Sequence, residues 1–161
     1  MNGWKVISIL LFLSLLAIGF ISISHKMEYK KDVSTYIESV NDWNKKQSSL
    51  QKEYKENVLD ETDAKTALQK LSSILDENES IIRRTQQFKT DYPELQVAVS
   101  TYQQALHEIS DAYQAFYYAM DTNEETIVKD GKASLDKADD FFKAHEEQIT
   151  SLAKKNFIHL K

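Results

Sequence analysis

The histidines are the residues of this chain best suited to metal or acid–base chemistry, and their neighbours argue against both roles. A helical bundle holds a di-iron centre through Glu-x-x-His pairs, but glutamine and phenylalanine stand three residues before His107 and His145. His107 and Asp111 share one face of a helix, which suits weak metal chelation, although an exposed polar pair is the simpler interpretation. His145 follows the apolar periodicity around it, so we expect it at the edge of the core.

Other catalytic patterns are missing from the sequence. No Gly-rich phosphate loop, G-x-S-x-G motif or H-E-x-x-H motif occurs. The pairs Asp139–Asp140 and Glu146–Glu147 fall between apolar positions, which is typical of a solvated helix face. With no cysteine, the chain lacks a thiolate nucleophile, a disulfide, a cysteine-based zinc site and a lipid-bearing cysteine. We therefore predict a protein that is not an enzyme and that needs no cofactor or metal.

The most distinctive local feature is the aromatic run from Tyr113 to Tyr118. Tyr113 and Phe116 fit a helical core stripe. Tyr117 and Tyr118 cannot both join them, because successive side chains of a helix point about 100° apart. At least one should reach the surface, where tyrosine is a favoured contact residue. We predict a partner-binding patch at Tyr117 and Tyr118; the alternative is that the run covers a wide core.

The elements that would position these residues begin with an uncharged run from Val6 to Ser24, VISILLFLSLLAIGFISIS. As a helix these nineteen residues would span roughly 28 Å, close to the hydrocarbon core of about 30 Å. We therefore predict a membrane anchor over residues 1–25, with Trp4 and Lys5 at the interface. The alternative is a secretory signal cleaved after the small residues Ser22-Ile23-Ser24.

The side of the membrane on which the rest of the chain lies is a separate question. Lysines 26, 30 and 31 outnumber Lys5, and by the positive-inside rule this favours a cytoplasmic domain. A short basic start before an apolar run is nevertheless typical of exported chains, and long C-terminal domains translocate largely regardless of charge. We predict a single-pass protein of the cell membrane with its C-terminal domain extracytoplasmic; a cytoplasmic domain and secretion after cleavage are the alternatives.

Residues 26–161 read as one helical domain. Glycine occurs 3 times and proline once, too few for a β-rich domain with its many tight turns. Apolar residues recur at alternating steps of four and three, with Gln47 filling one gap in the first stripe: Tyr29, Val33, Tyr36, Val40, Trp43, Leu50 and Tyr54. Three further stripes follow, beginning after the polar cluster Asp60–Asp63, at Pro93, and after Thr122-Asn123-Glu124-Glu125, which matches a capping box.

This pattern predicts an all-α protein: a transmembrane helix followed by an antiparallel up-down-up-down four-helix bundle. A three-helix bundle with a separate stalk helix is the alternative. In the last stripe Gly131 either allows close approach of two helices or ends one helix before a restart at Ser134.

Charge separates the two parts of the chain. Residues 1–31 carry four lysines and one glutamate, a balance of +3. Because the whole chain has a net charge of −5, residues 32–161 carry −8. A domain this acidic repels the phosphate backbone of nucleic acids, and we therefore predict no nucleic-acid partner. In an up-down-up-down bundle the C-terminal tail returns to the bilayer. We predict membrane-surface contact by basic and apolar residues there: Lys26, Lys30, Lys31, Lys154, Lys155, Phe157, Ile158, Leu160 and Lys161.

These features together predict a binding or scaffold protein of the bacterial cell envelope. Its partners would be the lipid bilayer and another protein, reached through helix-mediated contacts. The alternative is an envelope sensor or small-ligand-binding bundle, which a pocket lined by Tyr102, Tyr113 and Phe116 would favour.

Overall fold

The computed structural model describes the backbone of residues 3–160 and the side chains of residues 24–160. This part of the chain forms four α-helices, one π-helical segment and no β-strand. The helices are α1 (Gly3–Glu53), α2 (Ala64–Gln87), α3 (Pro93–Thr122) and α4 (Glu125–Lys155), and the π-helical segment η1 (Tyr54–Leu59) follows α1 directly. The prediction of an all-α protein is confirmed.

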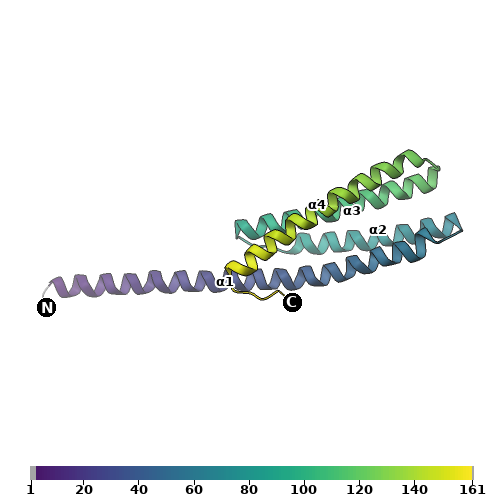
Figure 1. Ribbon diagram of the computed structural model, residues 1–161. Coiled ribbons are helices and arrows are strands. Elements are labelled where there is room, and N and C mark those ends of the chain that lie inside the picture. The colour runs from purple at the N-terminus through teal and green to yellow at the C-terminus, as the bar shows by residue number, and fades with distance from the viewer. Residues whose placement is uncertain (1–2, 161) are drawn as a thin grey trace.

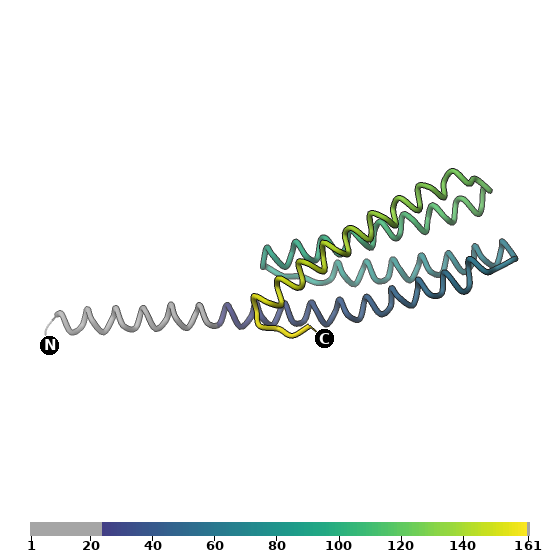
Figure 2. The backbone as a smooth tube through the Cα atoms, in the orientation of Figure 1, coloured from purple at the N-terminus to yellow at the C-terminus, as the bar shows by residue number. Residues whose placement is uncertain are grey.

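Successive helices alternate in direction (Figure 1). The α1–α2 and α3–α4 connections lie at one end of the bundle, and the α2–α3 linker and the C-terminal residues lie at the other, as the backbone trace in Figure 2 also shows. Helix α1 belongs to this bundle and is not a separate stalk, because Val33, Tyr36 and Leu50 are buried in the common core.

The predicted membrane span from Val6 to Ser24 lies, except for Ser24, outside the residues whose side chains the structure describes. Among the described residues, no helix has the length and apolar character that a membrane crossing requires.

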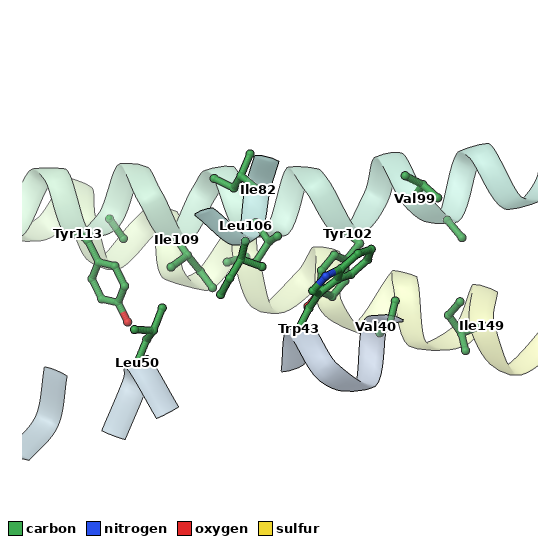
Figure 3. Packing of buried hydrophobic residues seen from close by; sticks show 14 of the residues in the cluster. Val40, Trp43, Leu50, Ile82, Val99, Tyr102, Leu106, Ile109, Tyr113 and Ile149 are labelled. Carbon is green, nitrogen blue, oxygen red and sulfur yellow. The ribbon is translucent and has the colours of Figure 1, made fainter. Parts of the chain in front are cut away.

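The core follows the predicted stripes closely. Figure 3 shows Trp43 of α1 against Tyr102 of α3, and Tyr113 of α3 pointing toward Leu50 of α1. The ring centroids of Trp43 and Tyr102 are 5.6 Å apart. Polar residues that share the buried faces are Gln47, Asn78, Thr85, Ser110 and His145. The four-three rhythm therefore identified the inward faces, and it placed Gln47 and His145 correctly among them.

The starts of two helices agree with the sequence. Asp63 caps α2, and its carboxylate accepts a hydrogen bond of 2.9 Å from the Thr66 amide. Pro93 occupies the first turn of α3, where its missing N–H leaves no hydrogen bond unmade.

The predicted capping box at Thr122 is wrong. Thr122 is the last residue of α3, and its hydroxyl donates to the Tyr118 carbonyl at 2.7 Å instead of capping α4. Asn123 adopts a left-handed conformation with φ of 58° and ends α3. Asparagine tolerates this conformation better than most residues, so the reversal needs only two residues and α4 begins without a side-chain cap.

Of the two roles predicted for Gly131, the structure shows that it allows close approach of two helices. Helix α4 continues through Gly131 and does not end there. A Cβ atom at this position would lie 2.5 Å from Cε1 of Phe116 and 3.1 Å from the Ala112 carbonyl oxygen. No side chain fits between α4 and α3 here, so glycine sets the distance between the two helices.

Candidate functional site

The described surface contains an open groove of about 550 Å³ between α1 and α4, which we call the α1–α4 groove. One wall is a face of α1, the other a face of α4, and one residue of the C-terminal tail closes part of it. The lining residues are Ile37, Val40, Asn41, Asn44, Gln47, Ser48 and Gln51 of α1, Phe142, His145, Glu146 and Ile149 of α4, and Leu160 of the tail.

The α1 wall combines two apolar side chains, Ile37 and Val40, with polar groups, and none of its described residues is charged. Its exposed side chains are the amides of Asn41, Asn44 and Gln51 and the hydroxyl of Ser48. Tyr102 donates a hydrogen bond of 2.8 Å to Oδ1 of Asn44, so the amide nitrogen of Asn44 is the group left to act as a donor toward the groove. Neutral amides and hydroxyls both donate and accept hydrogen bonds, and the wall therefore suits a neutral polar or peptide-like ligand better than an ion.

The α4 wall is built around a neutral histidine. His145 is only 4% exposed, and its Nε2 atom lies 3.0 Å from the Tyr36 hydroxyl on α1. Burial lowers the pKa of His145 to about 4 and raises that of Tyr36, so both side chains are neutral at pH 7. Among residues 24–160, Glu146 is consequently the one charged side chain that lines the groove.

A directed hydrogen-bond chain lies behind the α1 wall. Nδ2 of Asn78 donates to the Leu106 carbonyl at 3.3 Å, which fixes the orientation of the Asn78 amide. Nε2 of Gln47 donates to Oδ1 of Asn78 at 3.1 Å, and the buried Oε1 of Gln47 then has no hydrogen-bond partner among the described residues. A buried acceptor without a partner is costly, and it makes Gln47 the least satisfied polar group of the groove.

The tail reaches the groove from the end of α4. Phe157 has a φ of 53° and turns the chain back, so that the amide of Ile158 donates to the Ala153 carbonyl at 2.9 Å. Ile158 then packs against the core, and Leu160 lines the groove while remaining 46% exposed. The chain itself therefore provides a non-helical segment that lies against the groove.

The aromatic run is divided as its spacing predicts. Tyr113 and Phe116 are buried and stack against Tyr54, with ring centroids 5.3 and 5.9 Å away. Tyr117 packs partly against the core, whereas Tyr118 is 58% exposed. A partner-binding role for Tyr117 and Tyr118 stays a prediction, and Tyr118 is the better placed of the two.

Tyr102, Tyr113 and Phe116 are the residues expected to line a ligand pocket in a sensor. All three are buried core residues, and none of them lines the α1–α4 groove. Tyr102 nevertheless lies next to the groove, because it donates to Asn44 and packs against Phe142 and His145, three residues that line it.

The predicted membrane-contact residues occupy several different environments. Lys26, Lys30, Lys154 and Phe157 are exposed. Lys31 is also exposed but lines a hollow of mixed charge beside the α2–α3 linker. Lys155, Ile158 and Leu160 make contacts within the bundle, and Lys161 lies outside the described residues. Membrane contact by this set stays a prediction.

Glu94, at the start of α3, joins three elements at the same end of the bundle. Its carboxylate accepts hydrogen bonds from Nζ of Lys155 at 2.9 Å and from the Tyr29 hydroxyl at 3.2 Å. The hydrogen bond from Lys155 is the main cause of a lowered Glu94 pKa. Glu94 could not be identified from the sequence, because its partners belong to α1 and α4 and come together only in the folded bundle.

The possible metal-chelating pair His107 and Asp111 lies on the surface. His107 and Asp111 are both exposed on α3. Within residues 24–160 no three side chains of histidine, aspartate or glutamate gather in a geometry that would hold a metal ion.

Known proteins add no family assignment. Compared with protein-family models, with curated proteins and with solved structures, the chain gives no match.

Proposed function

We propose that the chain is a single-pass, membrane-anchored binding protein of the bacterial cell envelope, and that it holds a segment of a partner protein in the α1–α4 groove. The observation that carries this proposal is the groove itself, an open hollow of about 550 Å³ with one apolar and amide wall from α1 and one wall from α4. Binding sites are generally concave and combine apolar walls with a few polar groups that fix orientation.

The chemistry of the groove favours a peptide segment. Its α1 wall offers amides and a hydroxyl, which match the donors and acceptors of a peptide chain. Leu160 lines the groove from the chain's own non-helical tail, and this contact supports a groove that accepts a polypeptide segment with an apolar side chain.

Anchoring is supported by the sequence of residues 6–24, whose uncharged apolar length matches a bilayer core. In the orientation that we propose, the helical domain lies outside the cytoplasm. Fractionation of cells with alkaline extraction should leave the full chain in the membrane pellet, and protease added to intact cells should remove the domain. A chain that remains in the aqueous fraction would contradict the anchoring.

Groove binding can be tested in native membranes with a photo-crosslinking residue in place of Ser48, on the α1 wall. The matched control carries the same residue in place of Glu77, which is exposed on α2 away from the groove. We expect a discrete adduct from position 48 only. The adduct should disappear when Asn41→Glu places a charge in the wall. Equal adducts from both positions, or an adduct that Asn41→Glu leaves intact, would contradict the proposal.

A small-ligand sensor is the second candidate, and the size of the groove favours it. Ligand pockets typically measure about 300–1,000 Å³, and the groove falls in this range. Native mass spectrometry of the purified full-length chain distinguishes the two functions. A bound mass of a few hundred daltons that Asn41→Glu removes would favour the sensor.

A further inference from the structure

Three contacts place one end of the bundle beside the predicted membrane span. The Tyr92 hydroxyl donates to the His25 carbonyl at 3.3 Å, just after the apolar run ends at Ser24. The start of α3 and the end of α4 are joined to Tyr29 through Glu94, as described above. If residues 6–24 cross a bilayer, this end of the bundle lies at the level of the lipid headgroups.

The two most exposed of the large apolar side chains that the structure describes lie at this end. Met27 of α1 is 68% exposed, and Phe157, directly after α4, is 87% exposed. A soluble surface tolerates single exposed apolar residues, but these two come from distant parts of the sequence and both lie at the end closest to the span. Protein segments that lie on a membrane surface combine Lys or Arg with Trp, Phe or Leu side chains.

The backbone of Phe157 holds its ring in this position. With a φ of 53°, Phe157 occupies the left-handed position after a helix, where glycine is usual because it has no Cβ. The amide of Phe157 donates to the Lys154 carbonyl, and the next residue, Ile158, is held by the core. A bulky side chain in this conformation is costly, so the position points to a role for the exposed ring.

The predicted lysines that the structure describes fall into two groups, those free to contact lipid and those already engaged by acidic residues. Lys26 and Lys30 are one turn apart on α1, and Lys154 precedes Phe157; all three are exposed. Lys155 is engaged by Glu94, and Lys31 shares its hollow with Asp32 and Asp91. Glu28 and Asp32 are the acidic residues on the same part of α1, and Lys26, Lys30, Lys31 and Lys154 together exceed them and leave a net positive surface.

We propose that Met27, Phe157, Lys26, Lys30 and Lys154 form a basal surface that rests on an anionic lipid bilayer and holds the bundle upright above it. We assign lipid as its binding partner because Lys26 and Met27 closely follow the predicted span in the sequence. The inference rests on the proposed anchoring by residues 6–24. Its lysines would meet anionic headgroups, while Phe157 would enter the interface between headgroups and acyl chains.

The test uses the full chain in vesicles of phosphatidylglycerol and phosphatidylcholine whose acyl chains are brominated near the headgroup. Bromine quenches tryptophan at short range, so Phe157→Trp, in a Trp4→Phe background, reports contact with lipid. Leu59→Trp is the matched control, because Leu59 is 62% exposed in η1 at the opposite end of the bundle. Subtracting the Trp4→Phe parent removes the signal of Trp43.

We expect the Phe157→Trp signal to lose most of its intensity and the Leu59→Trp signal to keep it. Replacing Lys26, Lys30 and Lys154 by glutamine should restore much of the lost signal. Flotation of the same samples separates the two proposals. A chain that floats with the vesicles while position 157 stays unquenched keeps its anchor and overturns the basal surface. A chain that does not float overturns the anchoring and the basal surface together.

Discussion

The hydroxyl of Tyr36 on α1 and Nε2 of His145 on α4 lie 3.0 Å apart, although 109 positions separate them in the sequence. Each residue lies on the buried face of its own helix, and His145 also packs against Tyr102 with ring centroids 4.9 Å apart. The pair therefore fixes the rotation of α4 relative to α1 at the groove. It does so with a neutral histidine, which makes this contact sensitive to acid.

Acid should destabilise the bundle through His145. Its pKa falls from an ordinary value near 6.5 to about 4 on folding, so the unfolded chain binds the proton more tightly. The stabilisation is complete above pH 6.5 and is lost as the pH falls toward 4, with a total of about 3 kcal/mol. Urea unfolding of the full chain in mild detergent, followed by circular dichroism at pH 7 and pH 4.5, measures this loss.

The control for this effect is His145→Gln, which keeps a polar group beside Tyr36 but does not titrate. Its stability should be lower than that of the wild type at pH 7 and should change much less between the two pH values. Lowered pKa values of Glu61, Asp63 and Glu94 act at still lower pH and are common to both proteins. An equal acid response of the two proteins would exclude His145 as its source.

Gly131→Ala should destabilise the bundle, contrary to the usual effect of this change in a helix. Alanine is normally favoured over glycine by roughly 0.5–1 kcal/mol in a helix interior. Here the new Cβ would lie 2.5 Å from Phe116 and 3.1 Å from the Ala112 carbonyl, so we expect a loss of about 1–3 kcal/mol. Thermal unfolding measures it. The double variant Gly131→Ala, Phe116→Leu should recover part of the loss, and a more stable single variant would refute the close approach.

Much of this fold could be predicted from periodicity, and the reason is physical. Helical stripes report which side chains face inward, and the stripe through Val33, Tyr36, Val40 and Leu50 is buried throughout. A stripe does not report which helix it faces or how far apart two helices lie. The divergence of α1 and α4, and with it the groove, depends on these relations between helices and was not predicted.

The positions of buried polar residues likewise depend partly on contacts between helices, which a stripe does not report. Gln47 and His145 were placed in the core because they interrupt apolar stripes at the right spacing, but Asn78 was overlooked although it is fully buried. Its role depends on Gln47 and on the Leu106 carbonyl, two groups on other helices. The misplaced cap at Thr122 had a different cause, because Asn123 stabilises a left-handed turn that competes with the capping box.

Removing Asn78 alone should cost more than removing it together with Gln47. Asn78→Leu leaves the Gln47 amide buried without its partner and removes a second hydrogen bond to the Leu106 carbonyl, which α3 already engages, so we expect a loss of about 1–3 kcal/mol. In the double variant Gln47→Leu, Asn78→Leu the unpaired amide is gone, and part of the stability should return. Urea unfolding of both single variants and the double variant gives the coupling energy. Strictly additive losses would show that the two amides act independently.

Phe157→Gly should make the bundle more stable while removing a side chain that the basal surface needs. A non-glycine residue in the left-handed region costs roughly 1–2 kcal/mol, so relief of the 53° φ should raise the free energy of unfolding by about 1 kcal/mol. Little packing is lost in exchange, because the ring is 87% exposed. Phe157→Ala is the control, since it deletes the ring but keeps the Cβ, and its stability should stay near that of the wild type. If glycine and alanine stabilise the protein equally, the gain would come from loss of the exposed ring. A gain specific to glycine would show that the chain retains a phenylalanine against its local backbone preference, as a lipid-contact role requires.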